Sequence, residues 1–390
     1  MKIAIVWKND YPWDIRVEKI ARTLYSFGHD VHIIASNLRK ENNRDNIDGI
    51  TVHRLYAFKR NIVNRVISLP VFFNPFWLYS IYKVCKQNNI ELIIIRDLPL
   101  ALNGIVVGKM LKCRTIFDMA ELYSALWKDL PRSLFNFFFK NPSLAGFLEK
   151  KLLKLFDHIF VVVEEAKSTL EQLNIDGNKI SIVSNTPNLS DIELLTKSGN
   201  MVEWENKVIV LYHGYLNKAR GIEVVIRAMP ELIEKYNQLL LVLVGDGDSL
   251  GSYKKLCKEL DIENHVIFTG WVSFEQIPQL INAASICVIP HFANDHKNTT
   301  VPNKLFDYMA CKKPVIVSDA APLKRIVNEE KCGLVFKSGN ISNFIKAISL
   351  MLSDRHKMSE MGQRGKEAVI RKYNWSQDSL VMKSVVEKIG

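Results

Sequence analysis

The sequence lacks any apolar run of about 20 residues, the length that a helix needs to cross a bilayer. Its first eight residues are also too short and too quickly charged to form a secretory signal. These two absences predict a protein that works in the cytoplasm. A peripheral position on the inner face of the membrane stays open, because it requires neither a span nor a signal.

Cysteines are few and isolated. The chain has six, and they form neither a CxxC pair nor a cluster with histidine. This spacing argues against a disulfide framework and against a zinc site, so we expect the cysteines to be small buried apolar residues. No metal and no other cofactor is predicted.

The chain is long, and its basic residues are concentrated in its first part. It contains 390 residues, 48% hydrophobic and 24% charged, which is more than one core usually supports, so we expect two domains. The net charge is +11, and residues 1–160 hold 24 Lys and Arg against 14 Asp and Glu. A basic surface suits an anionic membrane or a phosphorylated substrate, and solvated charge without a partner is an equal interpretation. Nucleic acid is disfavoured, because no basic recognition motif is present.

Short apolar segments alternate with amphipathic ones along the chain. Strand–helix–strand units of this kind build parallel sheets. In the first part, strands are predicted at 2–7, 31–35, 91–95, 115–117 and 158–163, with a helix at 15–27. In the second part, strands are predicted at 208–212, 239–244, 266–268, 286–289 and 314–317, with a helix at 221–236. The fold class is therefore α/β, with two doubly wound, Rossmann-like domains.

The polar stretch 186–206 has no clear period and is interpreted as the linker. We assign residues 1–195 to an N-terminal domain and residues 196–375 to a C-terminal domain. Residues 376–390 predict a last helix, which could pack back on the N-terminal domain.

Ligands of open parallel sheets bind at the carboxyl ends of the strands, so the loops that follow strands are examined first. Residues 213–221 follow a predicted strand and place Lys218 and Arg220 between Gly214 and Gly221. The glycines allow close backbone approach, and the start of the next helix attracts anions. We interpret this loop as a phosphate clamp, with an ordinary glycine-bearing turn as the alternative.

Gly245 opens a second loop, Gly-Asp-Gly-Asp-Ser-Leu-Gly, where the backbone could approach a donor closely. Its glycine spacing is one residue longer than the dinucleotide fingerprint. Its aspartates resemble a DxD pair, which hard cations accept. A tight turn is the favoured interpretation of these carboxylates, because Asp and Gly are turn residues.

Gly270, Trp271 and Val272 form a third candidate, at the end of a predicted strand. Backbone groups exposed by the glycine could bind the edge of a base, and Trp271 could cover that base. A tryptophan in the core is an equal alternative.

The fourth candidate is the segment that begins with Pro302 and Asn303, which suit the first turn of a helix. We expect the amides of Asn303, Lys304 and Leu305 to be free donors at the positive helix end, where Lys304 adds a cation. Asp307 lies one turn further and could accept two vicinal ribose hydroxyls, although a surface helix acid is the plainer interpretation. Phosphate and diol recognition on one helix would describe a nucleotide-diphosphate site.

These four loops, in this order, resemble those of the retaining glycosyltransferases of family 4, and the resemblance covers almost the whole chain. It rests on residues 213–221, Leu-Val-Gly-Asp-Gly at 243–247, Phe-Thr-Gly-Trp-Val at 268–272 and Pro-Asn-Lys-Leu-Phe-Asp-Tyr-Met-Ala at 302–310. The resemblance implies the GT-B fold, in which two Rossmann-like domains face each other across a cleft. The C-terminal domain would bind the nucleotide sugar and the N-terminal domain the acceptor.

The resemblance also implies an activity. A hexose or N-acetylhexosamine would move from a nucleotide-diphosphate sugar with retention of configuration and without metal. A UDP-sugar is the favoured donor and a GDP-sugar the next. The acceptor would be a saccharide or an undecaprenyl-diphosphate-linked saccharide of a bacterial surface polysaccharide such as lipopolysaccharide. Arg220 and Lys304 would stabilise the departing diphosphate.

Three positions depart from the family pattern. Tyr215 stands where the family commonly has an arginine, and Thr299 replaces the first of two glutamates, leaving Asp307 in the place of the second. Ala120 replaces a histidine of the family's D-x-H-E sequence. Thr299 therefore removes an acid that would touch the sugar, and Ala120 removes an imidazole.

The remaining polar residues near Ala120 are Asp118, Glu121 and Arg16, and we expect Arg16 and Glu121 to face the acceptor. Two other functions stay open. One is a nucleotide-sugar-binding protein of this fold with weakened catalysis, and the other is an NAD-dependent oxidoreductase that uses the loop opened by Gly245.

Residues 66–82 and 133–156 combine aromatic residues with lysine and arginine, as segments at an anionic membrane interface do. They predict peripheral attachment near a lipid-linked acceptor. Two core helices with solvated lysines are an equal interpretation.

Overall fold

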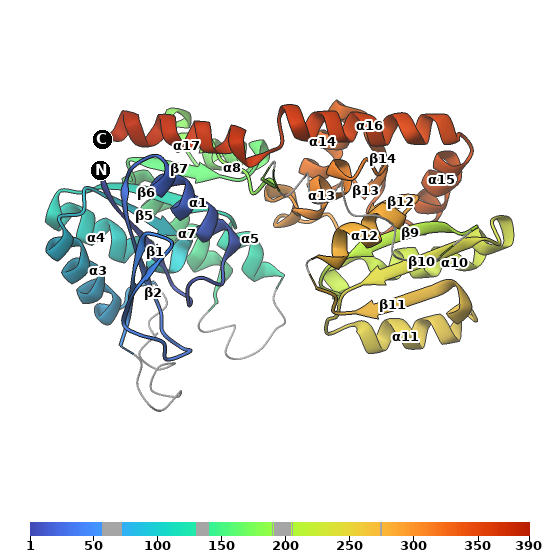
Figure 1. Ribbon diagram of the computed structural model, residues 1–390, viewed down its shortest axis with the longest axis horizontal. Coiled ribbons are helices and arrows are strands. Elements are labelled where there is room, and N and C mark those ends of the chain that lie inside the picture. The colour runs from blue at the N-terminus through green and yellow to red at the C-terminus, as the bar shows by residue number, and fades with distance from the viewer. Residues whose placement is uncertain (57–71, 130–139, 189, 191–203, 205, 274) are drawn as a thin grey trace. The chain divides into compact units, whose positions relative to one another are not determined.

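The computed structural model describes residues 1–56, 72–129, 140–188, 190, 204, 206–273 and 275–390. Most of the predicted linker, and residues 66–71 and 133–139 of the two basic aromatic segments, lie outside the described residues. The chain forms two compact units, which we call unit 1 (Met1–Asn185 with Asp378–Gly390) and unit 2 (Thr186–Gln377). Figure 1 shows both units with their elements labelled.

Unit 1 is built on an eight-stranded sheet in the order β3-β4-β2-β1-β5-β6-β7-β8, in which only β3 and β4 pair antiparallel. Its strands are β1 (Lys2–Trp7), β2 (Asp30–Ala35), β3 (Arg44–Ile47), β4 (Ile50–Arg54), β5 (Leu92–Arg96), β6 (Arg114–Met119), β7 (His158–Val161) and β8 (Ile180–Ile182). The predicted strands of the N-terminal part are confirmed. The sequence analysis did not predict the β3–β4 hairpin, because the alternating, half-exposed residues of an edge hairpin form no apolar run.

The helices of unit 1 are α1 (Ile15–Ser26), α3 (Pro75–Asn88), α4 (Ala101–Leu111), α5 (Tyr123–Lys128), α7 (Pro142–Leu152) and α8 (Glu164–Gln172), together with most of α17 (Trp375–Ile389). Each of α3 and α7 buries one face, so the described parts of the two basic aromatic segments contribute to the core of this unit. Asp378 of α17 accepts a hydrogen bond from the amide of Ser184 at 3.0 Å. The chain end from Asp378 onward therefore packs with unit 1.

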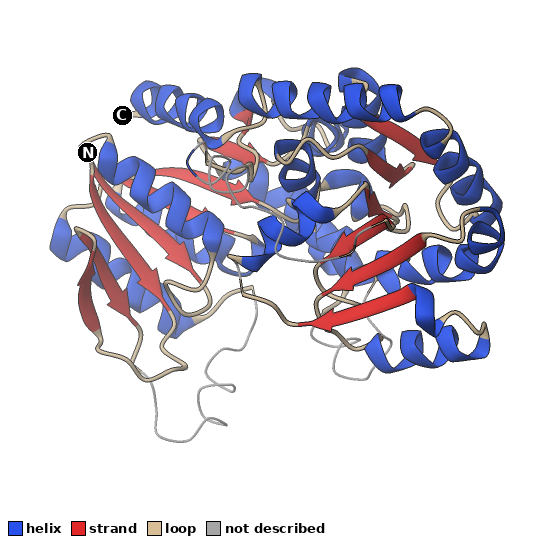
Figure 2. Cartoon of the chain, turned by 45° about the vertical axis from the view of Figure 1, so that its right-hand side comes forward, coloured by secondary structure: helices blue, strands red, loops and turns tan. Residues whose placement is uncertain are grey.

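Unit 2 is built on a six-stranded, wholly parallel sheet in the order β11-β10-β9-β12-β13-β14. Its strands are β9 (Val208–His213), β10 (Leu239–Val244), β11 (Val266–Gly270), β12 (Ile286–Ile289), β13 (Val315–Ser318) and β14 (Gly333–Phe336). Its helices are α10 (Ile222–Lys235), α11 (Leu250–Glu259), α12 (Gln276–Ala283), α13 (Lys304–Ala310), α14 (Ala321–Glu330), α15 (Ile341–Leu352) and α16 (Arg355–Arg371). Figure 2 shows the strands of each unit as a twisted sheet between helices, which confirms the predicted pair of Rossmann-like domains.

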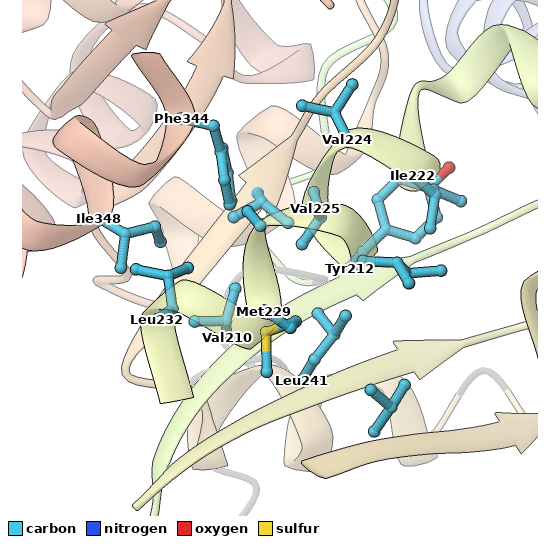
Figure 3. Packing of buried hydrophobic residues seen from close by; sticks show 14 of the residues in the cluster. Val210, Tyr212, Ile222, Val224, Val225, Met229, Leu232, Leu241, Phe344 and Ile348 are labelled. Atoms are coloured by element: carbon cyan, nitrogen blue, oxygen red, sulfur yellow. The ribbon is translucent and has the colours of Figure 1, made fainter. Parts of the chain in front are cut away.

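The core of unit 2 lies between its sheet and the helices α10 and α15. Every residue of β10 is buried, as expected for a strand covered on both faces. Figure 3 shows Phe344 and Ile348 of α15 beside Val225 and Leu232 of α10, and all four are buried in one apolar cluster. This packing fixes the sheet from which the candidate site projects.

In both sheets the strand order reverses once. In unit 2 the chain runs from β9 to β10 and β11 on one side and then crosses to β12 on the other. In unit 1 the corresponding reversal lies between β1 and β5. Ligands of doubly wound sheets bind at the carboxyl ends of the strands at such a reversal, so the loops after β9 and β12 are the first to consider.

Candidate functional site

The loops after β9, β10 and β11 are joined through glycine backbone. Gly214 donates its amide to the carbonyl of Val244 at 2.8 Å, and Gly245 donates to the carbonyl of Gly270 at 3.0 Å. All three glycines have positive φ, at 122°, 124° and 68° respectively. A Cβ at Gly245 would collide with the carbonyl oxygen of Gly214. The three loops therefore contact one another through their backbones, and close approach of this backbone to a donor stays a prediction.

Lys304, the first residue of α13, is buried beneath the loop after β9. Its Nζ lies 3.8 Å from the ring centroid of Tyr212, and a Cβ at Gly214 would come within 2.7 Å of the same nitrogen. A side chain at position 214 would therefore displace the ammonium group and would also be strained, because Gly214 has φ 122°. Burial, followed by the charge of Arg220, lowers the pKa of Lys304 well below its ordinary value, and Asp307 partly opposes this shift.

His213 lies at the end of β9 beside the same helix. Its backbone amide donates to the hydroxyl of Tyr308 at 2.9 Å, and its Nε2 lies 3.7 Å from a carboxylate oxygen of Asp307. Its Nδ1 is buried and has no hydrogen-bond partner in the described structure. Burial and the nearby Lys304 lower the pKa of His213 to about 3, so the imidazole is neutral at physiological pH.

Arg220 connects the loops on the two sides of the strand reversal. Its Nη1 donates to Nε2 of His291, which follows β12, at 3.4 Å. Gly221, at φ 65°, lies against the carbonyl of Pro290, where no side chain fits. His291 is only 1% exposed, and burial followed by the charge of Lys304 lowers its pKa well below the ordinary value. The sequence analysis did not single out His291, although its place directly after a strand and a proline was an available signal.

The arrangement around Lys304 therefore contains two cations and two neutral imidazoles. In the described part of the chain, no carboxylate forms an ion pair with Lys304 or Arg220. Burying positive charge without a partner is costly, and a bound anion removes that cost. The site is chemically suited to an anion.

The other donor-site candidates occupy varied surroundings. Lys218 is exposed at the start of a short 3₁₀ helix. Trp271 is 77% exposed, so the alternative of a core tryptophan is wrong, and Val272 beside it is half-buried. Thr299 is buried and donates its hydroxyl to the carbonyl of His296 at 3.1 Å.

One expectation about α13 is wrong. The amide of Leu305 is not a free donor, because it bonds to the carbonyl of Pro302 at 3.1 Å in a tight turn that opens the helix. Asn303, in helical conformation at this start, is exposed. The cation of Lys304, rather than a row of three amides, is the main feature of this helix start.

The aspartates after β10 serve the loop itself. Asp246 accepts from the amide of Gly247 at 2.6 Å, and Asp248 accepts from the hydroxyl of Tyr215 at 2.8 Å. This geometry agrees with the predicted tight turn. Across the described residues, no group of three His, Cys, Asp or Glu side chains is placed to hold a metal.

Unit 1 carries a buried charge cluster at the carboxyl ends of its strands. Arg16 is 3% exposed and binds both carboxylate oxygens of Asp118 through Nε, at 3.1 and 3.0 Å, and donates to the carbonyl of Ser184 at 3.2 Å. Burial opposes ionisation of Asp118, but Arg16 and then Arg96 hold its pKa below the usual value. Arg96 also donates to Asp97 at 3.0 Å. Arg16 thus has a structural role in this cluster, and its predicted contact with an acceptor stays a prediction.

Glu121 is half-buried between β6 and α5, and a buried carboxylate, Glu149, contacts the start of α5. Glu149 accepts from the amides of Tyr123 and Ser124, at 2.6 and 3.3 Å, and therefore binds the start of α5. Burial raises the pKa of Glu149 to about 7. Lys8, after β1, donates to the hydroxyl of Tyr123 at 3.1 Å. The acceptor-facing role of Glu121 stays a prediction.

Comparison with known proteins assigns this architecture. The family described as Glycosyltransferase Family 4 matches residues 15–190, and the family described as Glycosyl transferases group 1 matches residues 197–368. An uncharacterized glycosyltransferase of Methanocaldococcus jannaschii is 22% identical over 371 residues, which cover 93% of this chain and 90% of that protein. Several other curated relatives match over about half of their own length.

Solved structures share the fold over the whole chain. HepE of Anabaena in complex with UDP superposes with a TM-score of 0.73 at 14% identity, covering 100% of both chains. The lipopolysaccharide outer core galactosyltransferase WaaB superposes with a TM-score of 0.67 at 14% identity, covering 100% of this chain and 99% of the other. No helix in the described residues has the length and apolar character of a membrane span. With two family matches that together cover most of the sequence, and with this fold, the chain belongs to the glycosyltransferases of family 4 and has the GT-B fold.

Proposed function

We propose that this glycosyltransferase takes a sugar from a nucleotide-diphosphate sugar and transfers it, with retention of configuration, to a saccharide or lipid-linked saccharide of a cell-surface polysaccharide. UDP-sugars are the favoured donors and GDP-sugars the next. The observation that carries the proposal is Lys304, a lysine buried against Tyr212 without a carboxylate ion-pair partner among the described residues, at the strand reversal of unit 2. An ammonium group in this setting is stabilised by an anionic ligand.

A diphosphate meets this requirement better than a single carboxylate does. Lys304 and Arg220 present two cations, and His291 holds the guanidinium of Arg220 through its Nε2 at 3.4 Å. When the anomeric carbon–oxygen bond breaks, negative charge develops on the departing diphosphate. Cations already in place stabilise that charge without reorganising, which is how such groups accelerate a reaction.

Asp307 suits the ribose end of the donor. Its side chain is 28% exposed, one turn after Lys304, and its second oxygen lies near the neutral His213. A partly exposed carboxylate next to the diphosphate site can accept from vicinal hydroxyls. The UDP bound to the structurally similar HepE supports a nucleotide ligand for this fold.

A structural neighbour supports the proposed acceptor and pathway. The fold is shared with the lipopolysaccharide outer core galactosyltransferase WaaB. We propose that the transferred sugar is a hexose or an N-acetylhexosamine. A screen of nucleotide sugars that carry one or the other identifies which.

The test is calorimetric titration with UDP, GDP, their sugars and NAD, followed by NMR of the product of an acceptor screen. We expect micromolar binding of one nucleotide diphosphate, no binding of NAD, and an anomeric proton signal with the configuration of the donor. Tight binding of NAD alone would overturn the proposal in favour of an oxidoreductase. Binding of a nucleotide sugar without hydrolysis or transfer would support the alternative of a binding protein with weakened catalysis.

A further inference from the structure

Unit 1 has a basic cavity at the edge of its sheet opposite the charge cluster of Arg16 and Asp118. The cavity has a volume of about 440 Å³ and lies among the end of α4, the beginning of β6 and the segment after α7. Its lining includes three cations, Lys109, Lys112 and Arg114, and one carboxylate, Asp157. The proposed glycosyl transfer uses none of these residues.

The sequence builds this surface by ending α4 close to the sheet. A Cβ at Gly108 would come within 2.5 Å of the Thr115 methyl group, so the glycine lets the last turn of α4 lie against the start of β6. Lys112 then adopts a left-handed conformation, at φ 58°, and ends the helix. Lys109 and Lys112 both line the cavity and are exposed.

The single carboxylate of the cavity is already engaged. Asp157 pairs with Nη1 of Arg114 at 3.1 Å and accepts from the amide and hydroxyl of Thr115 at 2.8 and 3.1 Å. Asp157 therefore does not offset the charge of the two lysines, although the carboxylate of Glu91 lies close enough to the lining residue Cys113 to act on its thiol.

Apolar side chains stand beside these cations. Met110, between the two lysines in sequence, is 59% exposed, and Leu155, in the cavity lining, is 49% exposed. A soluble phosphate would use the cations but would leave both apolar side chains in water. A lipid surface with anionic headgroups uses both, because apolar side chains enter the interface while cations meet the headgroups.

We propose that this surface, made of Lys109, Met110, Lys112, Arg114 and Leu155, docks unit 1 on an anionic phospholipid bilayer with a headgroup phosphate in the cavity. It lies at the first residue of β6, whereas Asp118 lies near the last. Four residues of strand separate Arg114 from Asp118, or about 13 Å at 3.3 Å per residue. Docking here leaves the carboxyl edge of the sheet uncovered.

The experiment is co-sedimentation of the full chain with vesicles of phosphatidylcholine alone or mixed with phosphatidylglycerol. We expect binding only to the mixed vesicles, and weaker binding as salt rises. The double variant Lys109→Gln, Lys112→Gln should partition about thirtyfold less, since each cation near an anionic surface contributes about fivefold. Met110→Ser with Leu155→Ser should also reduce binding, without changing its dependence on salt.

Lysines near a helix C-terminus also stabilise the helix through its dipole. The control variant must therefore replace two lysines that also lie near a helix C-terminus. Lys255 and Lys258 of α11 have the same spacing, lie near its C-terminal end and are exposed on unit 2. Their double replacement by Gln should leave partitioning unchanged. Thermal melts of all variants show whether each is folded.

Three results would overturn the proposal. They are equal sedimentation of wild type and the Lys109/Lys112 variant, absence of sedimentation of the wild type, and equal binding to neutral vesicles. Binding of millimolar glycerol phosphate by a protein that does not sediment with the mixed vesicles would show a site for soluble phosphate instead of a membrane. Because sedimentation needs no donor or acceptor, this outcome is independent of whether the proposed sugar transfer is correct.

Discussion

Replacing Lys304 by methionine separates the effect of the buried ammonium group on stability from its effect on donor binding and turnover. Methionine keeps most of the stem beside Tyr212 and removes the charge. The pKa of Lys304 in the folded protein lies below its ordinary value of 10.5, so the folded state binds fewer protons than the unfolded state. The lysine therefore lowers the free energy of unfolding at neutral pH. This free energy rises as the pH rises toward 10.5. Lys304→Met should therefore stabilise the ligand-free protein at pH 7 by about 1–4 kcal/mol. The melting transition of unit 2 should rise by at least about 2 °C.

The same variant should lose function. Removing one charge-stabilising donor costs about 10²–10³ in turnover, and the nucleotide diphosphate should no longer raise the melting temperature. Scanning calorimetry with and without UDP or GDP measures both effects on one sample. Repeating the scans at pH 10.5 and above should shrink the stability difference between variant and wild type.

The matched control is Lys313→Met. Lys313 is also half-buried in unit 2, but its Nζ donates to the carbonyl of Asn282 at 2.7 Å, away from the site. It should not alter nucleotide binding. A Lys304→Met protein that melts lower than wild type and still binds the nucleotide diphosphate equally well would refute the reasoning, because the ammonium group would then be structural.

Other variants test the neighbouring features. Arg220→Ala should lower turnover at least about tenfold, whereas Lys258→Ala, at an exposed lysine of α11, should have little effect in the same transfer assay. Gly221→Ala should lower the melting temperature markedly, because its Cβ would collide with the carbonyl of Pro290 at positive φ. Glu149 has a folded pKa of about 7, raised above 4.5, so its contribution to stability is lost as pH rises from 4.5 through 7, and Glu149→Gln should flatten melting temperatures over that range. Transfer measured in EDTA should equal transfer without it, and a loss restored by a divalent cation would contradict metal-independent transfer.

The arrangement of strands was largely predictable from the sequence because both sheets are buried on two faces. β10 is apolar at all six positions and β1 at five, and such runs need no tertiary information to be recognised. The β3–β4 hairpin depends instead on pairing at a sheet edge, where residues alternate between half-buried and exposed. Its polar residues resemble those of a loop until the partner strand is known.

The candidate site was only partly predictable. The loops were found because they follow strands, but the position of the Lys304 ammonium group depends on packing against Tyr212 and beside Gly214, about 90 residues earlier in the chain. His291 was missed because its role comes from a neighbour, Arg220, across the strand reversal. The amide of Leu305 was misjudged because a tight turn at Pro302 supplied a local acceptor. Local pattern identifies which loops matter, and tertiary packing decides which of their atoms are available.

The two units differ in how buried charges are paired at the carboxyl ends of their strands. This difference affects which ligands each unit can bind. In unit 1, Arg16 is matched to Asp118 and Arg96 to Asp97, so the cluster balances its own charge. In unit 2, Lys304 and its neighbouring guanidinium have no carboxylate ion-pair partner among the described residues. A sheet edge whose buried charges are paired gains little from a bound anion and suits a neutral, hydroxyl-rich ligand. A sheet edge with unpaired buried cations is stabilised by a bound anion. This difference in charge supports the proposal that the diphosphate donor binds unit 2 and the sugar acceptor binds unit 1.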